Sequence, residues 1–478
     1  MSKELIIGRE YEIRQLEECC ESKESRLVLV YGRRRVGKSF LINQFFDNRF
    51  DFKLVGDNRL KKSEQLYNFH DELSRQWKKD TAVPGTWREA FFLLRDYLDE
   101  FTDDSRHVVF FDEMPWLDNQ KSGFLEAFEY FWNSYGAAKN NLIMIVCGSA
   151  TSWLVDNFDH NKGGLFNRQN CRIYLQPFNL YETEKFLIEK KGINWSRYDI
   201  AECYMILGGI PYYLDLLSRN MSPSENIDNL FFKKRGGLWD EFDNLYRTLF
   251  SNSDNYIKIV EALFRKKSGM NRKELLEETK LPSNAAFTRM LRNLSDSGFI
   301  TSYSYFGSRK KGTVFILCDF FTLFYLRFVK ENYGGDEEFW THHADQSSRM
   351  VWEERTFEAL CRSHLRQIKD KLSISGVSSE VSLWFCNARE EQSGARIDLL
   401  IDRRDRIIDI LEMKFSTDDY VITKEYDEVL RRKINVFREM TGTRKALHLV
   451  IVTTFGLKRN MYSSRVQSVI TLDDLFKP

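Results

Sequence analysis

The sequence has little of several features that would narrow the class of protein. Its 478 residues include only 7 prolines, and the eight cysteines contain no C-x-x-C pair. Zinc-ligand spacing is therefore absent, and a disulfide framework is not expected in a chain of this size. The formal net charge of +1 excludes binding of nucleic acid by bulk charge alone, but it is compatible with a local basic groove.

Long apolar runs are also missing. The most apolar run, Phe320 to Val329, is short and contains Arg327, so it predicts no membrane span. The first residues, MSKELIIGRE, lack the apolar stretch of a signal peptide. We therefore expect a cytoplasmic protein with no membrane partner, and the length predicts roughly two to four domains.

Short apolar strands alternate with helices in the first part of the chain. The expected strands are 26–32, 52–56, 107–113, 142–149 and 171–175. This alternation predicts an α/β fold with a parallel sheet, and such sheets bind ligands beyond the carboxyl ends of their strands. Gly32, Asp112 and Ser149 all fall at strand ends of this kind.

The segment Gly32 to Ser39 reads G-R-R-R-V-G-K-S, a full match to G-x-x-x-x-G-K-[ST] between a strand and a helix. It predicts a P-loop that binds ATP, because the two glycines let backbone N–H groups turn toward phosphate oxygens. Lys38 would reach the β and γ phosphates, and the Ser39 hydroxyl would ligate Mg²⁺. The expected nucleotide-binding residues here are Gly32, Arg33, Arg34, Arg35, Val36, Gly37, Lys38, Ser39 and Phe40.

Four further residues complete the predicted ATP site. Asp112 would hold the Mg²⁺ water shell, and Glu113 would orient or deprotonate the attacking water. Ser149 either contacts the γ-phosphate or the water, or is a turn serine at a strand end. Arg168 is either a surface arginine or a finger inserted into a neighbouring subunit, where such fingers raise the rate by ~10³–10⁵. A finger would imply a homo-oligomer formed through the ATPase domain.

Residues Ile7 to Leu217 resemble the archaeal-type AAA+ ATPases that carry a G-R-R-R-x-G-K-[ST] loop. Besides the P-loop, the matching marks are G-R-E at 8–10, F-D-E at 111–113, C-G-S at 147–149, Arg168, Q-P-F at 176–178 and G-G-I-P at 208–211. The resemblance implies that Gly8 and Arg9 lie by the adenine, that Ser149 is the sensor and that Arg168 is the finger candidate. Ala150 departs from the second serine that the family often has.

The next two segments predict a helical lid at 177–250 and a winged helix-turn-helix at 251–332. Helices are expected at 256–266 and 272–279, and a third begins after Asn284 and ends before Gly298. Arg289 and Arg292 on this third helix, with the basic run 309–311 on the wing, suit contacts to DNA phosphates. A winged helix that binds protein is the alternative.

Residues 348–478 predict a final α/β domain. A helix is expected at 350–369, strands at 381–386, 396–402 and 407–415, a helix at 425–440 and a strand at 447–453. A hairpin centred on Asp405 would place Asp398 opposite Glu412, with Lys414 on the same face. Facing carboxylates repel unless a cation joins them, and Mg²⁺ is a natural occupant. Lys414 would then position or deprotonate water, or stabilise charge on phosphorus.

An aspartate followed by Glu-x-Lys on the next strand resembles the PD-(D/E)xK nuclease core, here over Val351 to Thr453. The resemblance implies that Asp398, Glu412 and Lys414 are catalytic, that the two carboxylates bind metal, and that Glu358 adds an acidic group from the first helix. A solvated aspartate with a plain surface ion pair is the alternative, as is the same fold without activity.

The sequence as a whole thus predicts an α/β protein with four parts: a P-loop AAA+ core at 1–176, a lid at 177–250, a winged helix at 251–332 and a PD-(D/E)xK nuclease-like domain at 348–478. The expected function is ATP binding and hydrolysis coupled to action on nucleic acid, with ATP and Mg²⁺ as cofactors and DNA as a partner. The alternative is an ATP-controlled switch whose C-terminal domain binds DNA or a partner without cleaving.

Overall fold

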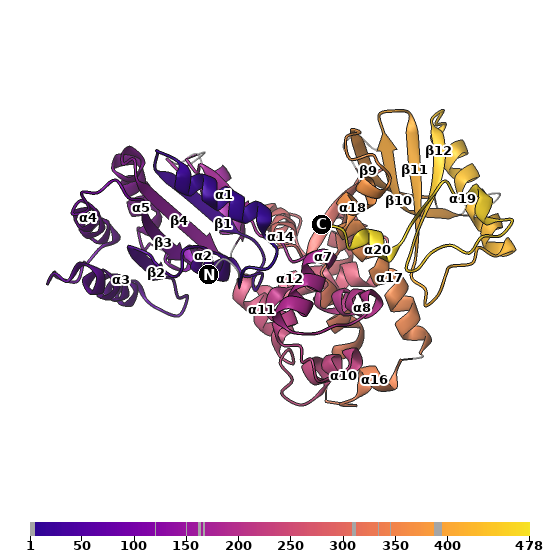
Figure 1. The fold of residues 1–478 in the computed structure, drawn as a ribbon, viewed down its shortest axis with the longest axis horizontal. Coiled ribbons are helices and arrows are strands. Elements are labelled where there is room, and N and C mark those ends of the chain that lie inside the picture. Colours follow the sequence, from indigo (N-terminus) through magenta and orange to yellow (C-terminus); the bar gives the residue numbers. More distant parts are fainter. Residues whose placement is uncertain are drawn as a thin grey trace. The chain divides into compact units, whose positions relative to one another are not determined.

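The computed structural model describes residues 5–119, 121–149, 151–160, 164–165, 168–307, 312–332, 334–344, 346–386 and 394–478. The chain divides into two compact units, Met1–Pro177 and Phe178–Pro478 (Figure 1). The division lies one residue beyond the predicted end of the ATPase core. Among the described helices, none is both long enough and apolar enough to cross a membrane.

The first unit is built from alternating strands and helices. Its strands are β1 (Arg26–Tyr31), β2 (Phe52–Val55), β3 (His107–Asp112), β4 (Leu142–Gly148) and β5 (Cys171–Tyr174). Its helices are α1 (Glu10–Glu21), α2 (Lys38–Phe45), α3 (Lys62–Trp77), α4 (Trp87–Leu98), α5 (Phe124–Ser134) and α6 (Thr151–Val155). All five strands begin within two residues of their predicted starts.

These strands form one sheet in the order β2-β3-β4-β1-β5, and every neighbouring pair is parallel. Every residue of β3 and of β4 is buried, as expected for strands covered on both faces. Because the strands are parallel, their carboxyl ends lie along one edge. The P-loop, Asp112 and Ser149 follow three adjacent strands at that edge, so the sheet brings them together.

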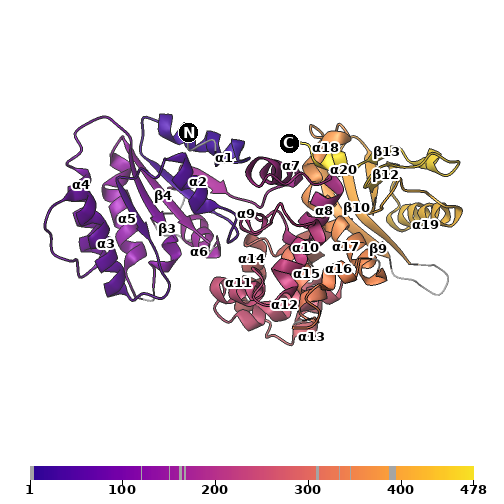
Figure 2. The ribbon, with the colours of Figure 1, turned by 60° about the horizontal axis from the view of Figure 1, so that its bottom comes forward.

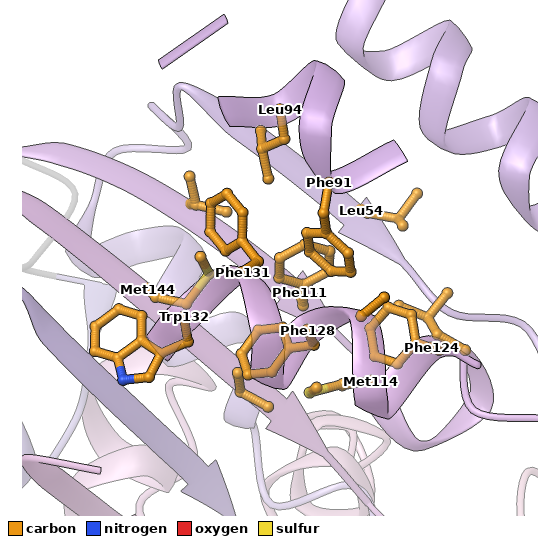
Figure 3. Packing of buried hydrophobic residues seen from close by; sticks show 14 of the residues in the cluster. Leu54, Phe91, Leu94, Phe111, Met114, Phe124, Phe128, Phe131, Trp132 and Met144 are labelled. Carbon is orange, nitrogen blue, oxygen red and sulfur yellow. The ribbon is translucent and has the colours of Figure 1, made fainter. Parts of the chain in front are cut away.

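Aromatic side chains fill the core between the sheet and the helices α3, α4 and α5 (Figure 3). The ring of Phe91 from α4 lies 5.8 Å from that of Phe111 on β3 and 5.3 Å from that of Phe131 on α5. Phe124 and Phe128 complete this cluster, and both are fully buried. Burial of such large side chains anchors β3, which carries Asp112 at its end.

The second unit begins with helices. They are α7 (Leu180–Lys185), α8 (Arg197–Leu207), α9 (Pro211–Asp215), α10 (Pro223–Ile227), α11 (Glu241–Leu249), α12 (Ser253–Arg265), α13 (Arg272–Thr279) and α14 (Ala285–Asp296). Asn284 caps α14 by accepting a hydrogen bond from the backbone of Phe287, as its position predicts. Strands β6 (Met270–Asn271), β7 (Ile300–Tyr305) and β8 (Thr313–Leu317) complete this part.

The rest of the unit combines helices and a larger set of strands. The helices are α15 (Phe320–Phe324), α16 (Phe339–His342), α17 (Ser347–Ser363), α18 (Leu365–Lys371), α19 (Lys424–Thr441) and α20 (Leu472–Leu475). The strands are β9 (Ser379–Cys386), β10 (Ala395–Arg403), β11 (Ile407–Lys414), β12 (Ala446–Thr453) and β13 (Ser468–Ile470). In Figure 2, α19 lies alongside β10, with which it makes contact.

One sheet of eight strands runs through the second unit in the order β13-β12-β11-β10-β9-β7-β8-β6. The hairpin β7–β8 is joined to the C-terminal strands because β7 pairs in parallel with β9, with Ser304 opposite Ser382. The sequence gives no sign of this pairing. The predicted wing is therefore part of a continuous sheet, and its basic run at 309–311 lies outside the described residues.

Two expectations for the C-terminal part were wrong in detail. The helix predicted at 350–369 is two helices, α17 and α18, with His364 between them. His364 is buried, and its ring accepts a hydrogen bond from the backbone N–H of Leu180 at 3.0 Å, so a contact from α7 fixes the break. The terminal elements β13 and α20 were not predicted, because three or four residues carry too little periodic signal.

Candidate functional site

The P-loop lies between β1 and α2 and has the backbone that phosphate binding needs. Gly32 has a φ of 139° and Gly37 a φ of 93°, both in the region that favours glycine. A Cβ atom at Gly32 would lie 2.2 Å from the carbonyl oxygen of Leu175, so a side chain has no room there. Gly37 is the N-cap of α2, and the free N–H groups of that first turn attract anions.

Lys38 crosses this loop. Its Nζ donates hydrogen bonds of 2.9 Å to the carbonyl oxygens of both Gly32 and Arg33. Only 5% of the side chain is exposed, and burial lowers the pKa of Lys38 despite the nearby acidic groups. The ammonium group is thus held at the loop itself, where a bound phosphate would compensate its charge.

Ser39 and Asp112 lie together at the same end of the sheet. The Ser39 hydroxyl donates to Asp112 Oδ1 at 2.9 Å, and the backbone N–H of Glu113 donates to the same oxygen at 3.0 Å. Burial raises the pKa of Asp112, and the charge of Glu113 adds to this effect. The serine hydroxyl and the carboxylate therefore converge as expected for two groups that share a Mg²⁺ ion and its water.

Glu113 and Ser149 also meet. Glu113 has a φ of 47°, an uncommon left-handed conformation for a glutamate. Its Oε2 accepts hydrogen bonds from the Ser149 hydroxyl at 2.8 Å and from the Ser149 backbone N–H at 3.0 Å. The predicted catalytic carboxylate and the predicted sensor are thus linked directly, a contact that the sequence alone did not indicate.

The remaining predicted residues of the ATP site differ in how far their side chains are buried. Arg9 is buried and donates to the carbonyl oxygen of Val36 at 3.4 Å, which places the segment Gly8–Arg9 beside the P-loop. Arg33 is buried, whereas Phe40 is 43% exposed. Arg168 is exposed and precedes β5. An exposed arginine of this kind is available to a neighbouring molecule, but its role stays a prediction.

The second candidate site lies on β10 and β11. The pairing of Leu399 with Leu411 and of Asp402 with Ile408 centres the hairpin on Asp405, as predicted, and the paired residues end at Leu399 and Leu411, next to Asp398 and Glu412. The register between β10 and β9 shifts between Ile397 and Leu400. This irregularity is a β-bulge that includes Asp398. Bulges of this kind redirect a side chain and are common next to active sites.

Both carboxylates are buried, with 8% of Asp398 and 1% of Glu412 exposed. Burial raises the pKa of Asp398, and the charge of Glu358 adds to it. Burial and then the charge of Asp398 raise the pKa of Glu412 to about 7. The two groups therefore repel each other, which is the situation that a shared cation relieves.

Glu412 already has a cation partner that the sequence analysis missed. Lys433 of α19 donates to both of its oxygens, at 2.6 and 2.8 Å, and the Tyr426 hydroxyl donates to Oε2 at 3.1 Å. Tyr426 and Lys433 are seven residues apart, so two turns of α19 bring them to one face. This spacing is the only feature of the sequence that relates Tyr426 to Lys433, and it does not indicate that either residue contacts Glu412.

Lys414 and Glu358 are also engaged elsewhere. Lys414 Nζ lies 2.8 Å from Glu354 Oε1, a carboxylate on α17 that was not predicted as part of the site. Glu358 is buried and forms ion pairs with Lys267 at 2.7 Å, Arg362 at 2.8 Å and Arg396 at 2.7 Å. The structure thus brings the four predicted residues into one region but gives three of them partners of opposite charge.

Within the described residues, no group of three or more His, Cys, Asp and Glu side chains is arranged to hold a metal ion. Two carboxylates are nevertheless enough for Mg²⁺, which keeps several waters and binds substrate phosphates. Asp398 and Glu412 supply this donor set.

A groove of about 900 Å³ lies where β7 meets β9. Its walls include the aromatic residues Tyr305 and Phe306, the basic residues Arg403, Arg404 and Lys445, and several serines. Two serine hydroxyls at this wall, on Ser379 and Ser382, are buried and have no hydrogen-bond partner within the part of the chain that the structure describes. On α14, Arg289 is exposed.

The fold and the first site are those of a P-loop ATPase domain with a parallel α/β sheet. Residues 6–217 match the model of a family described as an ATPase domain predominantly from Archaea. Residues 6–217 are therefore an ATPase domain of this kind.

Two relatives come from Methanocaldococcus jannaschii. An uncharacterized protein is 25% identical over 341 residues, which span 70% of this chain and 71% of that protein. An uncharacterized ATP-binding protein is 38% identical over 45 residues, 9% of this chain and 76% of that protein.

Two solved structures are also similar. The Walker-type ATPase PABY2304 of Pyrococcus abyssi has a TM-score of 0.47 at 22% identity and covers 68% of this chain and 97% of its own. The ORC2 protein of Aeropyrum pernix, in its ADPNP-ADP complexes, has a TM-score of 0.44 at 12% identity and covers 65% of this chain and 90% of its own.

Proposed function

We propose that this ATPase is directed to nucleic acid and that its ATPase domain controls metal-dependent phosphodiester cleavage by Asp398 and Glu412. The observation that supports the proposal is the register of β10 and β11, whose last pair, Leu399 with Leu411, comes directly before two buried carboxylates, Asp398 and Glu412. Buried like charges are unfavourable unless they serve a ligand, so their pairing is a functional signal.

In the ATPase domain, Lys38 and the N–H groups of the P-loop bind the phosphates, and Ser39 with Asp112 holds Mg²⁺. Glu113 then orients the attacking water. Ser149 donates to Glu113, so a γ-phosphate that competes for the Ser149 hydroxyl changes the position of the glutamate. This contact gives the nucleotide a direct way to control its own hydrolysis.

At the second site, Asp398 and Glu412 would hold Mg²⁺, which neutralises phosphate charge and lowers the pKa of a bound water. The raised pKa values of both carboxylates support this fit, because a divalent cation removes their repulsion. Tyr426 keeps one oxygen of Glu412 oriented. Lys433 supplies a positive charge beside the Glu412 carboxylate. It must release at least one oxygen of that carboxylate when a metal ion binds.

The second candidate function is an ATP-controlled switch whose C-terminal domain binds nucleic acid or a partner without cleaving. One observation favours it: the cations near the pair are already engaged, Lys433 with Glu412 and Lys414 with Glu354. A permanent Glu412–Lys433 ion pair would satisfy the buried carboxylate without any metal ion.

Cleavage distinguishes the two functions. The purified protein should be incubated with Mg²⁺ or Mn²⁺, with and without ATP, on single- and double-stranded DNA and on RNA. We expect cleavage that Asp398→Asn and Glu412→Gln each abolish, while ATP hydrolysis persists in both variants. Cleavage that persists in either variant, or that is absent from all substrates with every nucleotide, contradicts the proposed nuclease. The second outcome favours the switch.

A further inference from the structure

Glu358 lies in a cluster of cations where the turn after α12 meets α17 and β10. Lys267 from that turn, Arg362 from α17 and Arg396 from β10 all form ion pairs with it. Three positive charges therefore meet one negative charge, an excess of two. A buried carboxylate needs only one such partner for its own compensation.

The next charged residues around Glu358 leave the excess of two positive charges unchanged. Asp398 adds a negative charge, since it lies two residues after Arg396 on β10. Arg355 of α17 adds a positive charge, and it donates to the backbone carbonyl of Phe264 at 2.7 Å rather than to a carboxylate. Burial lowers the pKa of Arg355 to about 10, and the neighbouring arginines Arg396, Arg327 and Arg362 lower it further in spite of Glu358. Among the residues that the structure describes, the cluster is thus short of negative charge.

Arg362 is the most buried cation of this cluster. Only 8% of its side chain is exposed, and its Nε is buried without a hydrogen-bond partner among the described residues. Arg362, Arg396 and Lys267 line a small pocket of about 10 Å³, which has room for one oxygen atom. Lys267 and Arg396 are 37% and 34% exposed, so the cluster opens to solvent.

We propose that Lys267, Arg362 and Arg396 bind a backbone phosphate of a nucleic-acid strand. Phosphate matches the site because its oxygens accept several hydrogen bonds at once from guanidinium and ammonium groups. Because Arg396 is two residues from Asp398, a strand held here passes beside the Asp398–Glu412 pair. The position of the strand relative to a cleavage site rests on the proposed function, but binding of the phosphate does not.

Lys267 also explains how the helix-turn-helix segment and the C-terminal domain could act on one strand. It belongs to the turn between α12 and β6, whereas Arg362 and Arg396 belong to the C-terminal domain. A strand bound at the cluster therefore contacts both parts. Neither part alone would supply the three cations.

The test uses Lys267→Ala and Arg396→Gln in the full chain, with Lys266→Ala as the matched control. Lys266 is the sequence neighbour of Lys267, is 39% exposed and pairs with Glu274 instead of Glu358. A fluorescent single-stranded DNA is titrated at several salt concentrations without divalent metal. Each test variant should lower the slope of log affinity against log salt by about 0.7, the value for one lost phosphate contact on a single strand. The control and Lys267→Arg should keep the wild-type slope.

A slope in Lys267→Ala and Arg396→Gln equal to that of Lys266→Ala would overturn the proposal and leave the cations a structural role around Glu358. Thermal unfolding of each variant shows whether the fold is intact, and Lys267→Arg separates charge from packing. The proposed nuclease fails differently: Asp398→Asn would then leave cleavage unchanged, or no cleavage would occur, while the salt slope still falls in Lys267→Ala. Failure of the phosphate site and failure of the proposed nuclease can therefore be distinguished with the same protein preparations.

Discussion

The ATP site and the carboxylate site of β10 and β11 differ in how their charged groups are satisfied. In the first, the predicted residues contact one another: Ser39 with Asp112, and Glu113 with Ser149. In the second, the predicted residues contact groups that no motif contains, Glu412 with Lys433 and Lys414 with Glu354. The predicted groups of the ATP site come from adjacent parallel strands and meet at one edge of that sheet, whereas Glu412 and Lys414 take their partners from the helices α19 and α17.

The largest effect that tests this comparison concerns Arg168, the one predicted member of the ATP site that is exposed and precedes β5. If it completes the site of a neighbouring subunit, Arg168→Ala should reduce ATP hydrolysis by ~10³–10⁵. Mixing Arg168→Ala with Lys38→Ala protein should restore part of the activity, because one subunit then supplies the arginine and the other the P-loop. Steady-state ATPase assays over a range of protein concentrations measure this.

Turnover per molecule that does not change with concentration, and no recovery on mixing, would show that the ATP site is complete within one chain. Arg172→Ala provides a comparison, since Arg172 lies on β5 itself and is also exposed. A loss confined to the Arg168 variant is expected.

A somewhat smaller effect is expected for Glu113→Gln. The amide keeps the shape and can still contact Ser149, but it cannot act as a base, so ATP hydrolysis should fall by ~10²–10⁴ with ATP binding retained. Binding of a fluorescent ATP analogue and release of phosphate measure the two properties separately. Lys38→Ala should instead lose binding, because Lys38 is the cation held at the loop. Normal turnover in Glu113→Gln would mean that another group activates the water.

The third prediction tests whether the Glu412–Lys433 pair differs from the Lys414–Glu354 pair. Lys433→Met leaves a buried carboxylate without its cation and should destabilise the fold by about 3–5 kcal/mol. Lys414→Met should cost at most about 1 kcal/mol, because Glu354 is 46% exposed and solvent screens the pair. Urea unfolding followed by tryptophan fluorescence compares the two variants.

The double variant Lys433→Met with Glu412→Gln should recover most of the stability lost by Lys433→Met alone. If Glu412 binds metal, Mn²⁺ should stabilise Lys433→Met more than it stabilises the wild-type protein. Equal destabilisation by Lys433→Met and Lys414→Met would contradict the distinction between a buried and an exposed pair.

The smallest effect concerns pH and His364, at the break between α17 and α18. Burial lowers the pKa of His364 to about 4, whereas an unfolded histidine has a pKa of about 6.5. Between these values the unfolded chain binds a proton that the folded chain does not. The stability from the neutral ring is therefore complete above pH 6.5 and is lost as the pH falls, by up to about 3 kcal/mol at pH 4.

His364→Gln should remove this part of the pH dependence, as measured by urea unfolding at pH values from 7.5 to 4.5. His70→Gln, in the other unit, serves as the control. An unchanged slope in the His364 variant would show that the ring is protonated in the folded protein, and the hydrogen bond it accepts from Leu180 would then be absent.

Several parts of the fold were predictable because their signals are local. The five strands of the first unit, the P-loop and the cap at Asn284 follow from apolar runs, glycine positions and a capping side chain over a few residues. The register of β10 and β11 was predictable too, since a short hairpin fixes which residues face each other. The bulge at Asp398 was not, because it depends on the pairing with β9.

The sequence by itself determined the P-loop between its strand and helix, and the register of the hairpin formed by β10 and β11. Only the tertiary structure decided that β7 joins β9, that Lys433 reaches Glu412 and that Lys267 reaches Glu358. The physical reason is the distance along the chain. Groups joined by one loop or hairpin have their geometry set by a few backbone angles. Residues far apart in the chain, such as Glu412 and Lys433 or Glu113 and Ser149, meet only when helices and strands have packed.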